Sequence, residues 1–438
     1  MPQLEYDVIV VGGGATGVFT CLDLALRGIN VALLERGGLS SGTSGKFHGL
    51  LHSGARYAVN DPVAAAECAT ESQILSRIAP HVIADTGGLF VAITDEDAEY
   101  QAEFESGCKK CKIPYEEVPT EQVRQIEPKL NPTLKCAVKV NDKVIHAHDL
   151  VFCATMTASM HGAKFYPYRE VTDFLKKDER SIIGVRAYNN IKSRTEEFRS
   201  DLVINAAGPW AGRLAQLAGV NVEVTSFAGA MGVVPARLCS HVINRMRPPS
   251  DGDLMIPYGD NYSIMGTTAT LVDDPDKFDL SEEDLNLLID EGSEMFPVLR
   301  ELGFRRTYGS IRPLLMTGEA NEKDARKMSR TYDILDHESD GVTGLITISG
   351  GKLTTCRLMG EQIADLATEK LGIRQPSKTK DTKLLGSRVD QDARAISEAA
   401  GIDYGFVKRI METVGTVDEE RFMPAIRLLM SYAFSEVK

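Results

Sequence analysis

The chain has 438 residues, 43% of them hydrophobic and 25% charged, and carries a formal net charge of −13 at pH 7. This length can bury a sizeable core in two or three domains, and the acidic balance disfavours direct docking on nucleic acid or anionic lipid. No apolar run reaches the roughly 18 residues that span a bilayer, and no signal-peptide pattern opens the chain, so we expect a cytoplasmic protein with no transmembrane segment.

The first predicted unit covers residues 6–35, which read YDVIVVGGGATGVFTCLDLALRGINVALLE. The β-branched run Tyr6–Val11 predicts a strand buried on both faces, and it leads into GGGATG, a GxGxxG turn that opens a helix. In such a turn Gly12 allows the tight bend, Gly14 lets backbone N–H groups approach a pyrophosphate, and Gly17 lets the helix pack close to the sheet.

This unit continues into a second strand that ends in an acid. We expect the helix to run to Arg27, with Gly28 as its C′ residue, before a strand at Val31–Leu34. Glu35 follows 21 residues after Gly14, where a carboxylate can accept both hydroxyls of an adenosine ribose and repel a 2′-phosphate. Strand, glycine turn, helix, second strand and acid all occur at the spacing of a dinucleotide site, so we predict such a site. An incidental glycine turn would not explain the acid at Glu35.

The loop at residues 40–57, SSGTSGKFHGLLHSGARY, indicates which of two cofactors, a flavin or a nicotinamide, the site binds. It is rich in glycine and hydroxyl groups and leads into a stretch with histidine and arginine, which suits a flavin pyrophosphate and ring edge surrounded by backbone donors. A nicotinamide dehydrogenase would normally continue into another plain βα unit. We therefore predict a flavin.

Asp61-Pro62 then predicts the N-cap and first residue of a helix of about 17 residues ending near Pro80. The eight cysteines are scattered, as expected for reduced thiols in the cytosol. Only the pair Cys108 and Cys111 has metal-ligand spacing. With no second pair or adjacent histidine, we interpret it as the end of an amphipathic helix and predict no metal.

Two later apolar strands also end in glycine. Asp201–Gly208 and Gly344–Gly351 are predicted to be buried strands, and a helical stretch follows Lys352 and runs to about Leu371. Strands that end at Gly12, Gly208 and Gly350 fit the carboxyl edge of one parallel sheet, where doubly wound folds bind ligands.

The intervening segments, residues 86–150 and 225–335, combine short alternating strands with polar turns and predict an antiparallel, substrate-side sheet. Asp279–Phe296 is predicted to be a helix opened by a Ser281-x-x-Asp284 cap. After Gly372 we expect a polar linker and then a helical tail. Its last segment, Phe422–Phe434, is apolar on most faces and should be covered by its own chain, by a second copy in a homodimer or by a partner protein.

Several motifs together resemble the FAD-dependent glycerol-3-phosphate dehydrogenases, and among these the chain is most similar to the A subunits of the anaerobic enzymes. The resemblance extends from residue 6 to about 372 and is specific because the motifs keep their order and spacing. They are GGGATG, LLHSGARYAV (50–59), IAPHVIADTGGLF (78–90), HVINR (241–245), MGTT (265–268), IRPL (311–314), SR (329–330), LDH (335–337) and ISGGKLTTCRLM (348–359).

The resemblance implies an α/β fold, α+β overall, with a Rossmann-like FAD-binding domain of the two-dinucleotide-binding or D-amino-acid-oxidase type. An antiparallel-sheet substrate domain and a short helical C-terminal region complete it. The expected ranges are 1–85, 150–224 and 336–372 for the FAD domain, 86–149 and 225–335 for the substrate domain, and 373–438 for the tail.

The resemblance also implies that glycerol 3-phosphate is oxidised at C2 to dihydroxyacetone phosphate, with the hydride passing to flavin N5. A dianionic phosphate suits planar guanidinium groups, which bind it in a bidentate manner. The expected substrate residues are Arg56, Tyr57, Arg312, Arg330, Lys352 and Thr355. The expected FAD-binding residues are Gly12, Gly14, Ala15, Thr16, Gly17, Glu35, Arg36, Thr43, Ser44, His48, Gly49, Leu51, Ala207, Gly208, Trp210, Gly351, Lys352, Leu353 and Thr354.

The expected catalytic residues are His52, Lys352 and Arg312. His52 is the first candidate for the base because an imidazole titrates near neutral pH and lies four residues before Arg56. Lys352 would stabilise the alkoxide or the charge at N1 of the reduced flavin. His48 is a weaker candidate with a structural alternative.

The chain departs from the family pattern in two places. Met231 stands where the aerobic enzymes have a pocket histidine, which the anaerobic enzymes also lack. The cysteine-rich domain that normally follows in the anaerobic enzymes is not present in this sequence. Electrons are therefore expected to pass to quinone at the inner face of the cell membrane, reached through a partner, or to a separate carrier protein that docks on the chain. Direct oxidation by oxygen, as in glycerophosphate oxidases, is the other alternative.

Two other hypotheses stay open at this point. One is an oxidase or dehydrogenase of amino acids or 2-hydroxy acids in the same superfamily, although three arginines and a lysine suit a phosphate better than a carboxylate. The other is a polypeptide that binds FAD only for structure.

Overall fold

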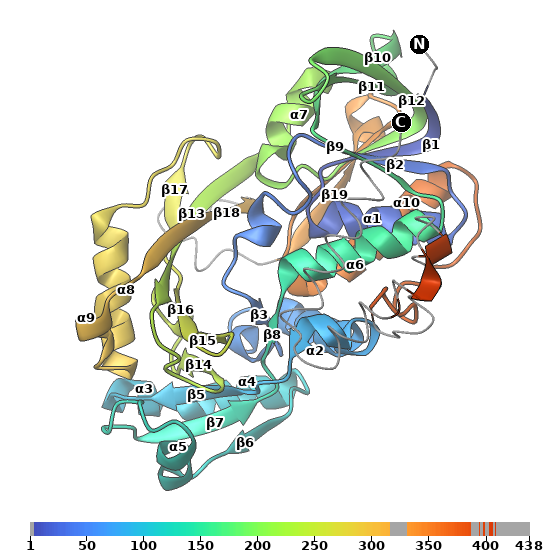
Figure 1. The fold of residues 1–438 in the computed structure, drawn as a ribbon. Helices are drawn as coiled ribbons and strands as arrows, with labels where there is room; N and C mark the ends of the chain where they lie inside the picture. Colours follow the sequence, from blue (N-terminus) through green and yellow to red (C-terminus); the bar gives the residue numbers. More distant parts are fainter. Residues whose placement is uncertain are drawn as a thin grey trace.

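The structure is a computed structural model that describes residues 4–315 and 331–386, together with Arg394, Ser397, Glu398, Asp403, Tyr404, Gly405 and Lys408. Figure 1 shows two sheet-containing halves, one carrying both ends of the described chain and the other built from the middle of the sequence. Arg330 and the apolar segment Phe422–Phe434 lie outside the described residues, as does most of the predicted tail.

The first half contains a largely parallel sheet formed by the buried apolar runs. Its strands are β1 (Leu4–Val11), β2 (Val31–Glu35), β9 (Lys164–Pro167), β10 (Arg169–Asp178), β11 (Ser181–Asn189), β12 (Arg194–Asn205), β19 (Tyr332–Asp336) and β20 (Leu345–Gly350). β1 lies parallel between β2 and β12, and β12 pairs in parallel with β20. The prediction that three glycine-tipped strands share one sheet edge is confirmed.

Both faces of this sheet are covered, which explains the unbroken apolar sequence of β1. Val8 and Val10 face a core shared with α1 (Ala15–Leu26), α6 (Ala147–Met160) and α10 (Cys356–Lys370). Ile9 and Val11 face the other side, where β10, β11 and α7 (Ala211–Ala218) pack. Each fully buried side chain of this kind contributes about 1.5–3 kcal/mol to folding.

The second half contains a larger sheet. Its strands are β5 (Gly88–Ala92), β6 (Tyr115–Glu117), β7 (Cys136–Val140), β13 (Val224–Val234), β14 (Val242–Arg245), β15 (Leu254–Tyr258), β16 (Tyr262–Gly266), β17 (Thr270–Val272) and β18 (Arg306–Leu315). Most pairs are antiparallel, as predicted, but β5 and β14 are parallel. These two strands come from separate segments of the chain, so no hairpin dictates their relative direction.

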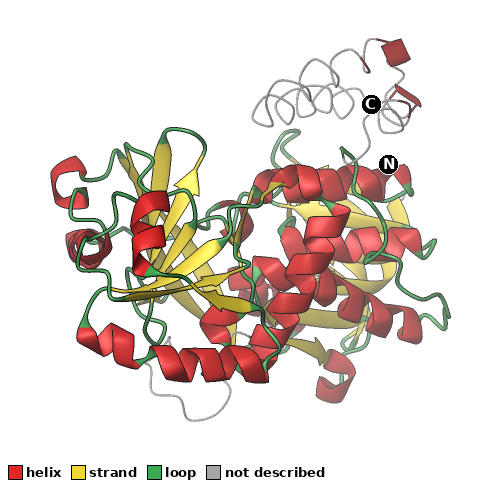
Figure 2. Cartoon of the chain, turned by 90° about the horizontal axis from the view of Figure 1, so that it is seen from below, coloured by secondary structure: helices red, strands yellow, loops and turns green. Residues whose placement is uncertain are grey.

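Helices pack against both faces of this sheet, since Leu89 and Phe90 of β5 belong to different core clusters; Figures 1 and 2 show helices beside the strands. They are α3 (Asp95–Glu99), α4 (Gln101–Lys110), α5 (Thr120–Ile126), α8 (Glu282–Met295) and α9 (Leu299–Leu302). The predicted Ser281 cap is present, since its hydroxyl accepts from the Asp284 N–H, although α8 is shorter than the predicted helix. The pair Cys108 and Cys111 lies at the end of α4, as predicted.

The two halves meet around α2 (Pro62–Ile78) and a small sheet of β3 (Leu50–Leu51), β4 (Ile83–Ala84) and β8 (Lys143–Ile145). The predicted N-cap of α2 is confirmed: the Asp61 carboxylate accepts from the Ala64 N–H. Short 3₁₀ turns complete the fold at Thr43–Gly45, Ala55–Tyr57, Pro80–Val82, Gly208–Trp210, His337–Asp340 and Leu353–Thr355. The domain ranges stay a prediction; because β19 pairs with β20, we propose that the last boundary lies before Tyr332.

The segment after Gly372 differs from the expected open linker. Thr379 is fully buried and donates its hydroxyl to Asp23, and the Leu384 N–H donates to the Ile78 carbonyl. Leu384 and Leu385 belong to the core of the first half. The hydroxyl groups of Ser377 and Thr379 both bond to the buried Asp23 carboxylate, so the polar composition of the segment was misleading.

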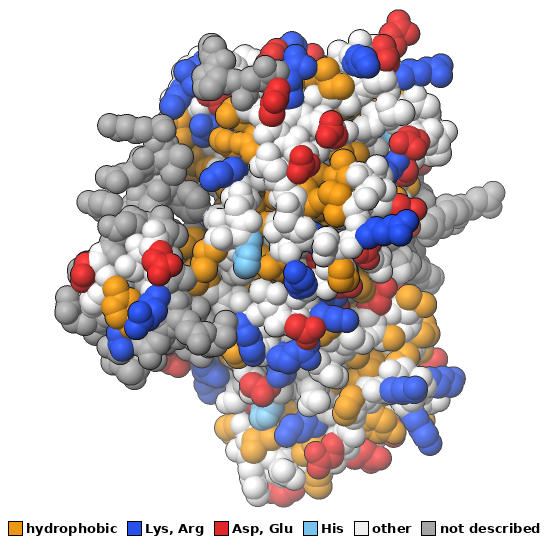
Figure 3. Space-filling model, turned by 90° about the vertical axis from the view of Figure 1, so that its right-hand side faces the viewer, with side chains coloured by type: hydrophobic (Ala, Val, Ile, Leu, Met, Phe, Trp, Pro, Cys, Tyr) orange, Lys and Arg blue, Asp and Glu red, His pale blue; other side chains and the backbone are white. Residues whose placement is uncertain are grey.

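Among the described residues, no helix combines the length and the apolar character that crossing a membrane requires. On the face in Figure 3, acidic and basic side chains are interspersed rather than gathered by sign.

Candidate functional site

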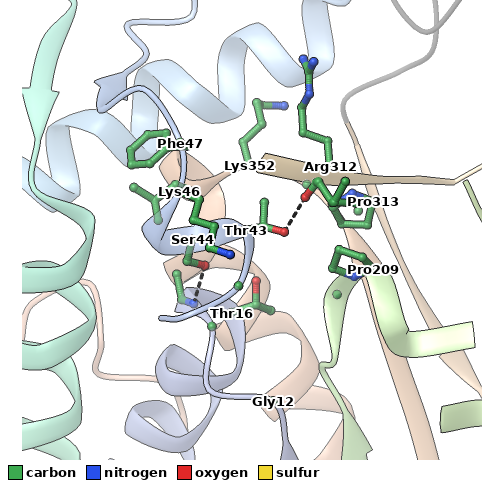
Figure 4. A pocket seen from close by; sticks show the side chains of 18 of the residues that line it. Gly12, Thr16, Thr43, Ser44, Lys46, Phe47, Pro209, Arg312, Pro313 and Lys352 are labelled. Atoms are coloured by element: carbon green, nitrogen blue, oxygen red, sulfur yellow. Dashed lines mark hydrogen bonds between the residues drawn. The ribbon is translucent and has the colours of Figure 1, made fainter. Parts of the chain in front are cut away.

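A cavity of about 900 Å³ runs along the glycine-tipped edge of the parallel sheet and reaches the second sheet. This volume is in the range of cofactor sites. Figure 4 shows residues that line it: Gly12 and Thr16 lie at the glycine turn, and Lys352 and Arg312 extend away from that turn toward the same end of the cavity.

The glycine turn leaves no room for side chains. A Cβ atom on Gly12, whose φ is +116°, would lie 2.4 Å from the Ala206 carbonyl oxygen of the neighbouring strand end. A Cβ atom on Gly17 would lie 2.0 Å from the Gly12 carbonyl oxygen. These approaches bring the backbone to the edge of the cavity and fix α1 against the sheet.

The N-terminus of α1 fits an anion. Its N-cap Gly14 provides no side-chain hydrogen bond, and the first turn contains no acidic residue to offset the helix dipole. The Ser44 hydroxyl, from the hydroxyl-rich loop, accepts from the Ala15 N–H at 2.9 Å and brings that loop over the turn. The arrangement therefore suits the pyrophosphate of a dinucleotide.

Glu35 lies at the end of β2, as predicted, and lines the cavity. Its carboxylate accepts from the N–H groups of Gly13 and Gly37, each at 2.7 Å. Beyond it, the Arg36 guanidinium lies 4.1 Å from the Trp210 ring centroid, and both residues line the cavity. This end therefore offers an anchored carboxylate and an aromatic wall, which suit an adenosine.

The opposite end of the cavity gathers cationic groups. Arg56 Nη2 donates to Asp253 at 2.9 Å and to the Ser250 carbonyl at 3.3 Å. Arg312 donates to the Thr268 carbonyl across Gly229, where a Cβ atom would lie 2.8 Å from the guanidinium. Lys352 Nζ lies 4.9 Å from the centroid of the Tyr57 ring.

Two histidines lie among these cations. Burial, together with the positive charges of Arg312 and Arg56, lowers the pKa of His48 to about 3, so this imidazole is neutral at physiological pH. Its Nδ1 accepts from the Leu50 N–H at 3.1 Å, which leaves the proton on Nε2. The ring of His52 lies 5.1 Å from the Tyr57 ring and 6.2 Å from the His48 ring, centroid to centroid.

The His52 loop is held by buried groups. The His52 N–H donates to Thr354 Oγ1 at 3.2 Å, and the next N–H, of Ser53, donates to Asp142 at 2.7 Å. Burial raises the pKa of Asp142 despite hydrogen bonds from Ser53 and Asn244. The loop that carries His52 is thus attached to both halves of the molecule.

Most of the predicted site residues line this cavity, while their individual roles stay predictions. The lining members are Gly12, Gly14, Ala15, Thr16, Glu35, Arg36, Thr43, Ser44, His48, His52, Arg56, Tyr57, Ala207, Gly208, Trp210, Arg312, Gly351, Lys352, Leu353 and Thr354. Arg330 is outside the described residues.

Four predicted residues do not line the cavity. Gly17 supports the turn from behind, and Gly49 and Leu51 are buried beside or within β3. Thr355 is fully buried, and its hydroxyl accepts from the Lys352 N–H and donates to the Lys352 carbonyl, at 3.3 and 3.1 Å. We propose that Thr355 shapes the Lys352 turn rather than contacting a substrate.

Other lining residues were not predicted. Lys46 lies within the loop at residues 40–57, and Thr267 belongs to the MGTT motif, so both carried a signal in the sequence. Asn60, Arg169 and Arg213 carried none, because only the tertiary structure brings them to the cavity. Met231 is buried in a core cluster of the second half. No cluster of metal-ligating side chains occurs in the described part of the chain.

The glycine-tipped sheet and the cavity that it shares with a second sheet define a dinucleotide-dependent oxidoreductase. The family model described as "FAD dependent oxidoreductase" matches residues 7–366. The A subunit of the anaerobic glycerol-3-phosphate dehydrogenase of Escherichia coli is 40% identical over 385 residues, which cover 87% of this chain and 70% of that protein. The corresponding A1 protein of Haloferax volcanii is 37% identical over 94% of this chain and 72% of its own length.

Solved structures have the same fold. The FAD complex of glycerol-3-phosphate dehydrogenase from Bacillus halodurans gives a TM-score of 0.71 at 23% identity, covering 100% of this chain and 79% of that one. The glycerophosphate oxidase of Mycoplasma pneumoniae with FAD bound gives 0.69 at 19% identity, covering 86% and 97%. The chain belongs to the FAD-dependent oxidoreductases and, within them, to the family of anaerobic glycerol-3-phosphate dehydrogenase A subunits.

Proposed function

We propose that this chain catalyses the FAD-dependent oxidation of sn-glycerol 3-phosphate to dihydroxyacetone phosphate. The observation that carries the proposal is that the two ends of the cavity differ in chemical character. One end presents a helix N-terminus, an anchored carboxylate and an aromatic wall for FAD, and the other presents Arg56, Arg312 and Lys352 for a small dianion.

The cationic end sets the substrate class. Arg56 and Arg312 are each held by an oxygen acceptor that limits their rotamers, and planar guanidinium groups suit bidentate binding of a phosphate. Arg56 shares its charge with Asp253, and Arg312 and Lys352 bring two further positive charges to the cavity, the number that a phosphate dianion carries with the opposite sign. Phosphate binding at this end would bring the carbinol carbon of the substrate toward His48 and His52, which line the same cavity.

Bound FAD supplies the two-electron acceptor for the carbinol hydrogen. The protein must then accept the hydroxyl proton and stabilise the developing oxyanion. We assign the proton to His52, and the oxyanion stabilisation to Lys352 with Arg312. The neutral His48 can donate from Nε2 but has little basicity, because its pKa is about 3.

We further infer that electrons leave the reduced enzyme for a quinone or for a partner protein, with the chain peripheral to the inner face of the cell membrane. The family membership supports this acceptor class. Oxygen is the competing acceptor, and a parallel assay with a quinone analogue and with oxygen separates the two.

Anaerobic photometry tests the function. Glycerol 3-phosphate added to the FAD-loaded protein should bleach its visible absorbance, and dihydroxyacetone phosphate should accumulate with an artificial electron acceptor. Glycine, proline and lactate serve as controls for the carboxylate-substrate alternatives. Bleaching by one of these and not by glycerol 3-phosphate would overturn the proposal, and no bleaching by any of them would favour a structural flavin.

A further inference from the structure

We propose that Asp253 is a positioning residue that orients Arg56 for the substrate phosphate; this inference rests on the proposed function. Asp253 follows the polar turn before β15, does not line the cavity and is fully buried. No sequence motif pointed to it. The role of Asp253 follows from the hydrogen bonds that its carboxylate accepts.

Asp253 fixes one side of the Arg56 guanidinium. Its Oδ2 accepts from Arg56 Nη2 at 2.9 Å and from the Ser250 N–H at 2.5 Å, and its Oδ1 accepts from Arg247 Nε at 2.7 Å. Both carboxylate oxygens are therefore used, and the carboxylate cannot rotate without breaking charge-assisted hydrogen bonds. The Ser250 carbonyl also accepts from Arg56 Nη2.

The other side of the same guanidinium is unused. Arg56 Nη1 is buried and has no hydrogen-bond partner among the described residues, although Arg56 lines the cavity. A buried, unsatisfied guanidinium nitrogen is costly unless an anion completes it. Asp253 thus holds Nη2 on the protein side and leaves Nη1 for the ligand.

A chain of alternating charges extends from this pair through the second half. Arg247 also pairs with Glu291 at 2.8 Å, Glu291 with Arg245 at 2.9 Å, and Arg245 with Asp97 at 3.0 Å. Each interior member touches opposite charges on both sides. Arg56 and Asp97 are the two ends of this series of ion pairs, and each has one charged neighbour within the series.

The far end of the chain is completed by protein. Asp97 Oδ2 accepts from the N–H groups of Ile93 and Thr94 at the start of α3, at 3.0 and 3.1 Å. The near end, Arg56 Nη1, has no such partner among the described residues. The three arginines and three carboxylates balance in charge, so what this end lacks is a hydrogen-bond acceptor for Nη1, and the cavity is where a ligand oxygen can supply it.

The decisive experiment compares Asp253→Asn with Asp97→Asn. Both changes remove one buried carboxylate charge from the same chain, so they are matched for structural damage, but only Asp253 touches Arg56. In FAD-loaded Asp253→Asn we expect the KM for glycerol 3-phosphate to rise about tenfold with kcat changed less than twofold, the signature of lost ground-state binding. Asp97→Asn should keep the wild-type KM.

Two further measurements make the test specific. In an Arg56→Ala background, Asp253→Asn should add nothing to KM, because the group that it orients is gone. Inorganic phosphate, titrated against the flavin spectrum of the oxidised protein, should bind about tenfold more weakly to Asp253→Asn. If that variant does not fold, Arg247→Gln, at a partly exposed site, should give a smaller rise in KM in the same direction.

The outcomes separate the two proposals. An unchanged KM in Asp253→Asn, an equal rise in Asp97→Asn, or an additive effect in the Arg56→Ala background would overturn the positioning role. A wild-type protein that binds phosphate through Arg56 and Asp253 but is not reduced by glycerol 3-phosphate would overturn the proposed function and leave the positioning role standing.

Discussion

The Glu35 carboxylate holds the glycine turn, in addition to the ribose contact predicted for it. The sequence predicted only a ribose contact, but in the structure its two oxygens also accept from Gly13 and Gly37 and so fix the glycine turn to the end of β2. Removing the side chain should therefore loosen the turn as well as delete a ligand contact.

Glu35→Ala should raise the dissociation constant for FAD at least about tenfold, because charge-assisted hydrogen bonds to backbone and ribose are lost together. The dissociation constant of Glu35→Gln should lie between those of the wild type and of Glu35→Ala, since the amide oxygen retains one acceptor. Fluorescence titration of the apoprotein with FAD measures both, with the exposed Glu5→Ala as the control. Full flavin content in Glu35→Ala would show that the ribose site lies elsewhere.

Arg312 lies on β18 and is held by the Thr268 carbonyl over Gly229. In Arg312→Ala the KM for glycerol 3-phosphate should rise about 10- to 150-fold, since one charge-assisted hydrogen bond is worth about 1.5–3 kcal/mol. FAD content should not change. Steady-state kinetics check this, with exposed Arg305→Ala as a matched loss of charge outside the cavity; an unaltered KM would remove Arg312 from the substrate site.

At the scale of elements, the close packing of α1 against the end of β1 depends on Gly17. Gly17→Ala would place a methyl group 2.0 Å from the Gly12 carbonyl oxygen, so α1 must move away from the sheet. We expect a loss of about 1–3 kcal/mol in the free energy of unfolding, together with weaker FAD binding, although Gly17 does not line the cavity.

Urea unfolding and FAD titration measure both effects in Gly17→Ala. Gly38→Ala is the control, because an added Cβ there meets only the Tyr168 hydroxyl, at an ordinary 3.8 Å. Wild-type stability in Gly17→Ala would mean that the turn relaxes without moving the helix.

At the scale of the whole molecule, the two halves are joined across the cavity by a segment that follows β17. Arg213 pairs with Asp274 at 2.6 Å and with Asp276 at 2.9 Å, and Arg36 pairs with Asp276 at 2.7 Å. Pro275 and Asp276 line the cavity, so this segment lies at the adenosine end of the site.

Asp276→Asn should accelerate the release of FAD by a small factor, about two- to fivefold, because partly exposed ion pairs contribute little individually. Added salt should accelerate release from the wild-type protein and have less effect on the variant. Stopped-flow fluorescence of released FAD measures both rates. Equal salt dependence in the two proteins would argue against an electrostatic attachment.

The stability of the whole fold should also decrease in acid through His81. Burial against α6 lowers the pKa of His81 to about 4. Between its ordinary pKa and this value the unfolded chain binds a proton that the folded chain does not, so stability is full above about pH 6.5 and falls as the pH decreases toward 4.

The loss between pH 7 and pH 5 should be smaller in His81→Gln, by up to about 2 kcal/mol. Urea unfolding at the two pH values gives the difference, and exposed His161→Gln is the control. A pH dependence equal to that of the wild type in His81→Gln would assign the acid sensitivity to other groups.

The sequence by itself determined the glycine turn, the acid at Glu35, the caps of α2 and α8 and the buried strands that end in glycine. These features depend on contacts within about 30 residues or on apolar periodicity, which local sequence records directly.

Only the tertiary structure decided the rest. It turned the Thr355 hydroxyl toward Lys352, buried the polar segment around Thr379, and joined Arg56 to Asp253 across 197 positions of the sequence. Such partners are selected by sheet pairing and by the demand that every buried charge find an opposite one. Local propensity cannot predict these pairs, because the requirement arises only when segments that are distant in the sequence are buried together.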